Sequence, residues 1–153
     1  MMLLLLLLAL QGRASLGVFE RWGAFRDASP RHCFAIAEPS GDRPGSTRPF
    51  ASVATWPSDG VRNQLHVRLS RDRHSGASVT LSIGERRFEL IAGSNDAWAP
   101  DPRTDAAIVA AMRGGRSMSV ESLGTSGVPF ADVYSLKGAA TAIDAAALGC
   151  VRR

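Results

Sequence analysis

The chain has 153 residues, 45% of them hydrophobic, and a formal net charge of +4 at pH 7. This length supports one ordinary domain with a single hydrophobic core rather than several domains. The arginines are scattered along the chain and form no continuous stripe, so we predict no nucleic-acid partner.

The first predicted element is an export signal over residues 1–14. An unbroken apolar stretch from Leu3 to Leu10 precedes the small-x-small run Gly12-Arg13-Ala14, which is typical of a signal-peptidase site. The stretch is shorter than the roughly 20 residues of a transmembrane helix, so a membrane anchor is the weaker interpretation and a buried N-terminal helix is another. We expect cleavage after Ala14, a mature domain over residues 15–153, and no transmembrane segment in that domain.

Short strand patterns fill the middle of the chain. Residues 33–38 predict a buried strand that ends at Pro39, and residues 39–49 predict a polar loop rich in proline and glycine. Further strands are predicted at residues 50–56 and 64–70. The second of these alternates between two faces, with Leu65, Val67 and Leu69 on one face and His66 and Arg68 on the other.

Residues 77–92 predict a β-hairpin. Its two strands each place apolar side chains on one face, namely Val79, Leu81 and Ile83 on the first and Phe88 and Leu90 on the second. Gly84-Glu85 between them suits a type II′ turn, because glycine tolerates the positive φ of the first central position.

The last third of the chain changes to helical periodicity. Asp101 and Pro102 predict the N-cap and first turn of a helix that ends at Gly114, and a strand follows over residues 116–122. A strand through residues 133–136 leads into a second helix that ends at Gly149. We therefore predict a mainly β fold, an antiparallel β-sandwich or open barrel with two short helices in the C-terminal half.

The only two cysteines, Cys33 and Cys150, lie near the two ends of the mature domain. An even cysteine count in an exported protein favours a disulfide, whereas the same residues in a cytosolic chain would suggest free thiols. Metal binding is a weaker alternative, because His32, His66 and His74 form no short-spaced ligand cluster with either cysteine. We predict a Cys33–Cys150 bridge that holds the C-terminal segment against an early strand.

Aromatic side chains are few, which makes each one informative. We interpret Trp22, Trp56 and Trp98 as core or core-edge anchors, because burial of a large ring stabilises a small domain strongly. In the alternative interpretation, one of these tryptophans lines an exposed groove for a glycan or peptide together with Phe50 or Tyr134.

Catalytic and metal sites have the weakest support in the sequence. Ser126 lies in GTSGV, which lacks the Gly-x-Ser-x-Gly spacing of a nucleophile elbow and is more typical of a turn. Asp96, Asp101 and Asp105 do not have the spacing of an EF-hand, and Asp101 suits a helix cap while Asp96 suits an Asx turn. We therefore predict no catalytic residue, no cofactor and no metal ligand.

The order of several short motifs resembles the invasion-associated locus B family of small exported bacterial proteins. The shared features are an early tryptophan, a cysteine in an apolar strand before a proline, an Ala-Trp pair before a helix, and a final helix that leads to a cysteine. The motifs that carry the resemblance span the mature chain and are FERWGAF, CFAIAEP, RRFEL, AWAPD, AAMRGG and DVYSLKGAATAIDAAALGC.

The resemblance implies a periplasmic, secreted or surface-exposed β-rich protein, of a family implicated in some members in entry into host cells. It implies no catalytic residue, so we expect a non-catalytic binding or interaction protein of the cell envelope. Its expected partner is an envelope or host-surface protein or glycan. The alternative is a periplasmic hydrolase or hydrolase inhibitor whose site the sequence does not reveal.

Overall fold

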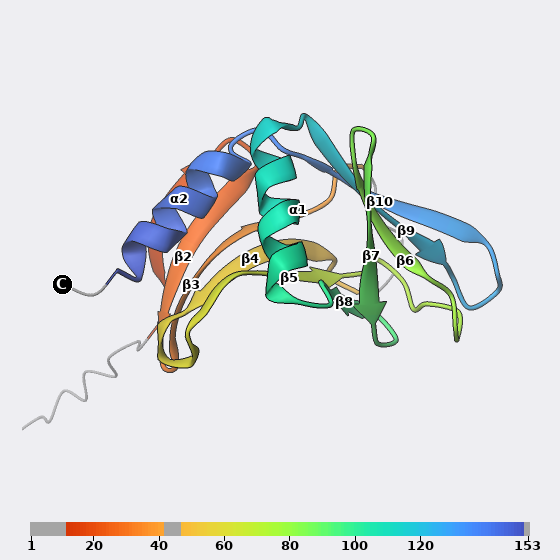
Figure 1. Cartoon of the computed structure of the whole chain (residues 1–153), viewed down its shortest axis with the longest axis horizontal. Helices are drawn as coiled ribbons and strands as arrows, with labels where there is room; N and C mark the ends of the chain where they lie inside the picture. The colour runs from red at the N-terminus through yellow and green to blue at the C-terminus, as the bar shows by residue number, and fades with distance from the viewer. Residues whose placement is uncertain (1–11, 42–46, 152–153) are drawn as a thin grey trace, which may run out of the picture.

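The computed structural model describes residues 12–41 and 47–151, which form a curved antiparallel sheet with two helices on it (Figure 1). The ten strands lie in the order β1-β2-β3-β4-β5-β8-β7-β6-β9-β10, so β1 and β10 form open edges. This architecture confirms the predicted mainly β fold with two helices in the C-terminal half, and the sheet does not close into a barrel.

The elements follow one another along the chain in numerical order. The strands are β1 (Ala14–Phe19), β2 (Trp22–Ala28), β3 (Arg31–Ala37), β4 (Phe50–Trp56), β5 (Val61–Arg68), β6 (Val79–Ile83), β7 (Arg86–Ala92), β8 (Asp96–Trp98), β9 (Ser117–Leu123) and β10 (Pro129–Ser135). The helices are the short 3-10 helix η1 (Pro57–Asp59), α1 (Pro102–Gly114) and α2 (Ala139–Gly149).

Three strands, β1, β2 and β8, have no counterpart in the sequence-based prediction. The three residues of β8 are too few to show alternation, and their conformation is set by pairing with β5 on one side and β7 on the other. The interpretation of Asp96 as an Asx-turn residue is wrong, because Asp96 belongs to β8. The last strand begins at Pro129, earlier than predicted, because it pairs with the whole length of β9.

Parts of two predicted segments lie outside the described residues. These parts are residues 1–11 of the export signal and residues 42–46 of the polar loop. In the described part of the signal, Ala14 is the first residue of β1, and cleavage after it stays a prediction. Among the described residues, no helix is both long and apolar enough to cross a lipid bilayer.

Both helices pack on the same face of the sheet (Figure 1). Helix α2 lies against β1, β2 and β3, and α1 lies against β5. The strands alternate accordingly, so that Cys33 of β3 and Val67 of β5 point toward the helices and join the buried core. The predicted alternation of residues 64–70 is confirmed, because Leu65, Val67 and Leu69 are fully buried.

Local sequence explains two sharp features of the chain. Ile83 pairs with Arg86 across the predicted Gly84-Glu85 turn, and Gly84 has the positive φ that this turn requires. Gly138 precedes α2 with a φ of +84°, and a Cβ atom there would collide with the Phe19 carbonyl oxygen. Glycine at position 138 therefore allows α2 to begin directly against the β1–β2 turn.

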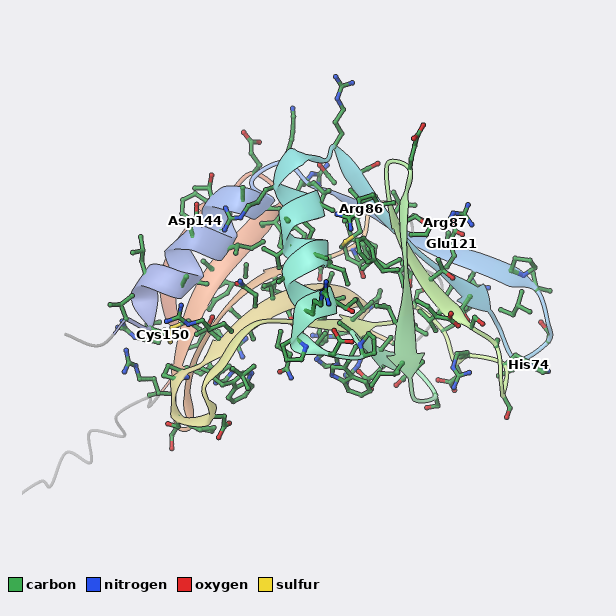
Figure 2. The ribbon with its side chains drawn as sticks, in the orientation of Figure 1. His74, Arg86, Arg87, Glu121, Asp144 and Cys150 are labelled. Atoms are coloured by element: carbon green, nitrogen blue, oxygen red, sulfur yellow. A yellow bond between two sulfur atoms is a disulfide. The ribbon has the colours of Figure 1, made fainter. Side chains whose placement is uncertain are left out.

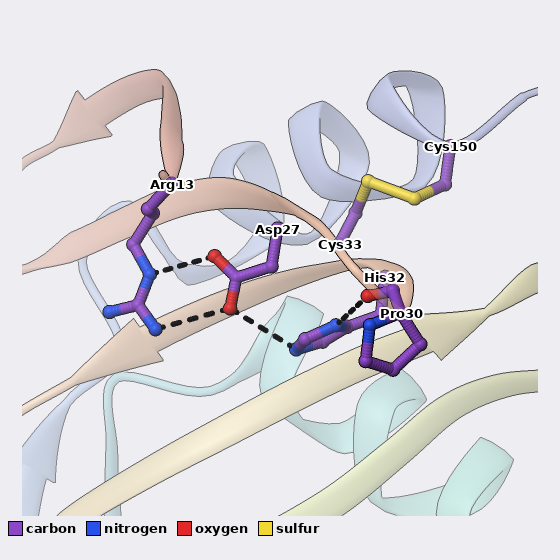
Figure 3. A network of polar contacts seen from close by, with 6 residues as sticks. All are labelled: Arg13, Asp27, Pro30, His32, Cys33 and Cys150. Atoms are coloured by element: carbon purple, nitrogen blue, oxygen red, sulfur yellow. Dashed lines mark hydrogen bonds and ion pairs between the residues drawn. A yellow bond between two sulfur atoms is a disulfide. The ribbon is translucent and has the colours of Figure 1, made fainter. Parts of the chain in front are cut away.

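The C-terminal end of α2 is joined to the sheet by the Cys33–Cys150 disulfide (Figure 3). Cys33 lies in β3, Cys150 follows α2 directly, and the two residues are 117 positions apart. The bridge therefore holds the last helix against an early strand.

Helix α1 has the predicted cap and one unpredicted contact with the sheet. Asp101 is the N-cap, and its Oδ1 accepts a hydrogen bond from the Thr104 amide at 2.7 Å. One turn later, the buried Asp105 carboxylate accepts a hydrogen bond from the Leu65 amide at 2.9 Å. Strand β8 pairs only with residues 66–68 of β5, so Asp105 satisfies an amide that lies beyond the end of that ladder.

Candidate functional site

The sheet face opposite the helices is where the candidate site lies. Because side chains alternate along a strand, the neighbours of the core-facing residues point to this open face. On β3, β4, β5 and β8 they surround a hollow with a volume of about 460 Å³, which we call the aromatic groove. This volume lies in the range of small-ligand sites.

The floor of the aromatic groove is formed by two small residues of β4, Ser52 and Ala54. Ser52 pairs with Ile36 of β3 and with His66 of β5, and Ala54 pairs with Phe34 and Gln64 in the same way. Larger side chains thus stand on both sides of a strand that carries small ones. The hollow forms because small side chains on β4 are paired in register with larger side chains on both neighbouring strands.

One end of the aromatic groove is built around His32, which stacks on Trp56 with ring centroids 3.9 Å apart and planes 6° apart. His32 Nδ1 donates a hydrogen bond to the Pro30 carbonyl oxygen at 2.9 Å, and Nε2 lies 3.6 Å from Asp27 Oδ2 (Figure 3). Asp27 accepts two hydrogen bonds from Arg13, at 2.9 and 3.2 Å. We call His32, Trp56, Asp27, Arg13 and Phe34 the first histidine cluster.

The Arg13 guanidinium also lies over the Phe34 ring, 4.9 Å from its centroid. Its hydrogen bonds hold the pKa of the Asp27 carboxyl below the usual value, and its positive charge adds to that effect. Arg13 itself lies within the predicted export signal. Cleavage after Ala14 would therefore remove it from the first histidine cluster.

The other end of the aromatic groove repeats the same five residue types. His66 stacks on Trp98 with ring centroids 5.2 Å apart and planes 8° apart. Its Nε2 donates a hydrogen bond to Asp96 Oδ1 at 2.7 Å, and Arg68 Nε donates to the same oxygen at 3.2 Å. The Arg68 guanidinium lies 5.5 Å from the centroid of the Phe50 ring. We call these five residues the second histidine cluster.

The two histidine clusters hold the aromatic walls in fixed positions. Each histidine ring stacks with one face on a tryptophan, and one of its ring nitrogens makes a polar contact that restrains it. The rings come from different strands, so they keep their arrangement only while the β3–β4–β5–β8 ladder is intact. The result is a preorganised apolar hollow with charged groups at its rim.

The structure separates the four aromatic residues singled out in the sequence. Trp56 and Trp98 both line the aromatic groove together with Phe50, whereas the alternative interpretation placed one tryptophan in such a groove. Trp22 and Tyr134 are fully buried in the core. Trp22 Nε1 also donates a hydrogen bond to the Ser135 carbonyl oxygen at 2.8 Å.

Sequence reasoning missed the charged members of the two histidine clusters. His66 is partly buried and paired with Asp96, whose strand was not predicted. The available signal was the alternation of residues 64–70, which places His66 and Arg68 on one face. Their partner could not be found without the position of β8.

Among the described residues, neither Ser126 nor the groove serine is hydrogen-bonded to a histidine ring. Ser126 lies in the β9–β10 turn, and no hydrogen bond among the described residues joins it to a histidine. The groove serine, Ser52, donates instead to the His66 carbonyl oxygen at 3.5 Å. In the described part of the chain, no three histidine, cysteine or acidic side chains gather as metal ligands.

Comparison with known proteins identifies a similar fold. No protein-family model matches the sequence, and no curated protein matches it. The structure is similar to the crystal structure of invasion associated protein B from Bartonella henselae, with a TM-score of 0.65 over 89% of this chain and 98% of that chain. The two sequences are 17% identical, so the likeness is one of fold.

Proposed function

We propose that this chain is an exported, non-catalytic binding protein of the bacterial cell envelope, and that it binds its ligand in the aromatic groove. The fold of invasion associated protein B supports the assignment to that type of protein. The Cys33–Cys150 bridge supports export, because disulfides persist mainly in oxidising compartments. The observation that carries the proposal is the aromatic groove itself, bounded by two histidine clusters of the same composition.

The aromatic groove has the character of a contact surface. Trp56 and Trp98 remain partly exposed on an uncovered sheet face, although full burial of such rings would stabilise the fold. Apolar hollows with a few placed polar groups are typical of ligand sites. A ligand that covers the rings would contribute the burial that the protein itself does not provide.

The polar groups of the aromatic groove suit recognition better than catalysis. His66 donates to a carboxylate and His32 donates to a backbone carbonyl, and each ring is stacked on a tryptophan. A general base would also need a nucleophile within reach of its second ring nitrogen, and the groove serine Ser52 donates to the His66 backbone carbonyl oxygen instead. Gln64 and the outer guanidinium nitrogens of Arg68 remain suited to hydrogen bonds with a ligand.

The expected partner is a protein or glycan of the envelope or of a host-cell surface. The expected location is the periplasm, the outer surface or the medium. A contribution to host contact is part of this proposal, because the protein of similar fold is described as invasion associated. The proposal rests on groove residues within 15–153, so it stands with or without Arg13.

The test is a double substitution, Trp56→Leu with Trp98→Leu, in the full exported protein. Labelled wild-type and variant proteins are titrated onto isolated outer membranes and onto host cells. We expect binding to fall at least about tenfold, because central aromatic residues carry much of the energy of such contacts.

The matched control is Val128→Ser with Leu123→Ser, which removes two exposed apolar side chains at the β9–β10 turn. This control should bind like the wild type. Equal binding by the groove variant and the wild type would contradict the proposed function, provided that circular dichroism shows both proteins folded.

A further inference from the structure

A second surface, unrelated to the aromatic groove, lies where α2 ends on the helix-covered face. Arg26 of β2 and Arg31 of β3 border a hollow of about 860 Å³ there, together with apolar side chains. We call this surface the α2-end patch. Its main members are Leu16, Arg26, Arg31, Leu148 and Val151.

The apolar part of the α2-end patch is unusually exposed. The exposed fraction of Leu148 is 73% and that of Val151 is 57%. Leu148 lies in the last turn of α2, and Val151 follows the disulfide-linked Cys150 at the end of that helix (Figure 2). Large apolar side chains that gather on an exposed surface are typical of contact with a partner or a membrane.

The charged part of the α2-end patch is entirely basic. Arg26 donates a hydrogen bond to the Gly149 carbonyl oxygen at 3.3 Å, and Arg31 donates to the Val151 carbonyl oxygen at 3.4 Å. No carboxylate among the described residues pairs with either guanidinium, whereas Arg13, Arg68 and Arg113 each pair with an aspartate. The free donors of Arg26 and Arg31 therefore face solvent beside apolar side chains.

We propose that the α2-end patch docks the protein on an anionic membrane surface. Arg26 and Arg31 bind the phosphate groups of lipid headgroups, while Leu148 and Val151 enter the boundary between headgroups and acyl chains. Charge complementarity favours this occupant, because the described lining of the hollow contains two arginines and no acidic residue. Arginines suit the charged headgroup region of a membrane surface, and the exposed apolar side chains next to them suit the acyl-chain region below it.

A protein ligand fits the patch less well. The Gly149 and Val151 carbonyl oxygens at the end of α2 already accept hydrogen bonds from the two arginines, so they are less open to the backbone of a partner protein. The free donors are guanidinium groups, which bind phosphate in paired geometry. The proposal does not depend on the aromatic groove, which lies on the opposite face of the sheet.

The test is sedimentation of the full oxidised protein with phospholipid vesicles. Vesicles of one part phosphatidylglycerol and three parts phosphatidylethanolamine should bind the wild type, and phosphatidylcholine vesicles should bind it at least about tenfold more weakly. Inorganic phosphate at the same phosphate concentration should not displace the protein, because it lacks the apolar layer.

Two patch variants separate the contributions of charge and apolar contact. Arg26→Gln with Arg31→Gln, and Leu148→Ser with Val151→Ser, should each lower vesicle binding about tenfold or more. The second pair lies on exposed positions, so it tests the surface even if loss of the arginines loosens the end of α2.

The matched control removes the same charge elsewhere. Arg86→Gln with Arg113→Gln changes one arginine on β7, away from Cys150, and one on α1 that pairs with Asp144 (Figure 2). This control should bind vesicles nearly like the wild type. Absence of binding to the anionic vesicles, wild-type binding by both patch variants, or an equal loss in the charge control would overturn the proposal.

The outcome is distinguishable from that of the proposed function. Trp56→Leu with Trp98→Leu should sediment with vesicles like the wild type, since the aromatic groove takes no part in membrane docking. Loss of vesicle binding in that variant alone would also overturn the proposal, because it would move the membrane contact to the open face.

Discussion

The two faces of the sheet use the same residue types for opposite purposes. On the covered face, Trp22 is fully buried and its indole N–H is hydrogen-bonded. On the open face, Trp56 and Trp98 are each stacked on a histidine and stay partly exposed. The role of a tryptophan in this fold is therefore decided by which face of its strand it occupies and by what covers that face.

The aspartates on the two faces differ in the same way. Asp105, between α1 and β5, has a raised pKa because burial disfavours its charged form. Asp27, on the open face, has a lowered pKa because Arg13 donates hydrogen bonds to its carboxylate. Burial between α1 and β5 thus disfavours charge at Asp105, whereas pairing with Arg13 stabilises charge at Asp27.

Removal of the disulfide should have the largest effect on the covered face. The double substitution Cys33→Ala with Cys150→Ala frees a loop of 117 residues in the unfolded chain. The chain-entropy estimate for so long a loop is about 4 to 5 kcal/mol of unfolding free energy. Urea denaturation of the variant measures this loss, and reduced wild-type protein serves as the control.

The stacked rings of the open face belong to the β3–β4–β5–β8 ladder, so the folded disulfide variant should keep its groove-dependent binding. If the disulfide variant lost less than about 1 kcal/mol of unfolding free energy, the bridge would not be a main source of stability, since release of a loop of this length should cost several times more.

Substitution of one tryptophan on each face of the sheet tests the difference between the covered and the open face directly. Trp22→Ala should lower the free energy of unfolding by about 3 to 5 kcal/mol, because it leaves a large cavity and an unpaired carbonyl. Trp98→Ala, on a partly exposed position, should cost only about 1 kcal/mol. Thermal and urea denaturation of both variants provide the measurement, and equal losses would show that the two faces do not differ as described.

The smallest expected effects are pH-dependent and have opposite signs. Asp27 has a folded-state pKa below its unfolded value, so its contribution is fully present above the unfolded pKa and is lost as pH falls through the folded pKa. Asp27→Asn should therefore lower stability at pH 7 by about 0.2 to 1 kcal/mol, as for an exposed ion pair, and the difference from wild type should shrink below about pH 4.

Asp105 has a folded-state pKa above its unfolded value, so its ionisation weakens the fold at neutral pH and the penalty disappears on acidification. Asp105→Asn keeps an oxygen for the Leu65 amide and should give a small gain in stability at pH 7 that vanishes in acid. Denaturation between pH 3 and pH 7 checks both signs. A loss of stability in Asp105→Asn at neutral pH would contradict the burial argument.

Arg13 supplies a control for the Asp27 prediction. In a chain that begins at Ser15 the guanidinium is absent, so Asp27→Asn should have little effect on stability. Intact mass of the exported protein shows which of the two N-termini exists. An unchanged effect of Asp27→Asn in the shorter chain would mean that another group stabilises the carboxylate.

The candidate site was predictable in part. Alternation marked His66 and Arg68 as residues of one face, and the scarcity of aromatic residues drew attention to Trp56 and Trp98. Their assembly into one groove depends on the register between β4, β5 and β8, which brings Ser52 beside His66 and His66 beside Trp98. Local periodicity does not encode such pairing between strands.

The amino-acid sequence accounts for the features that depend on neighbouring residues. It predicted the β6–β7 hairpin through Gly84, the start of α1 through Asp101 and Pro102, and the apolar face of β5 through alternation. Turn chemistry, capping and alternation are local, and each acts within a few positions of the chain.

Which face of the sheet the helices cover is set by the packing of the whole folded chain. This packing buried Trp22 and left Trp56 and Trp98 open, while the pairing of β5 with β8 joined His66 to an aspartate 30 residues away. The physical reason is that burial and ion pairing depend on distances in space, which the order of strands sets and the chain order alone does not.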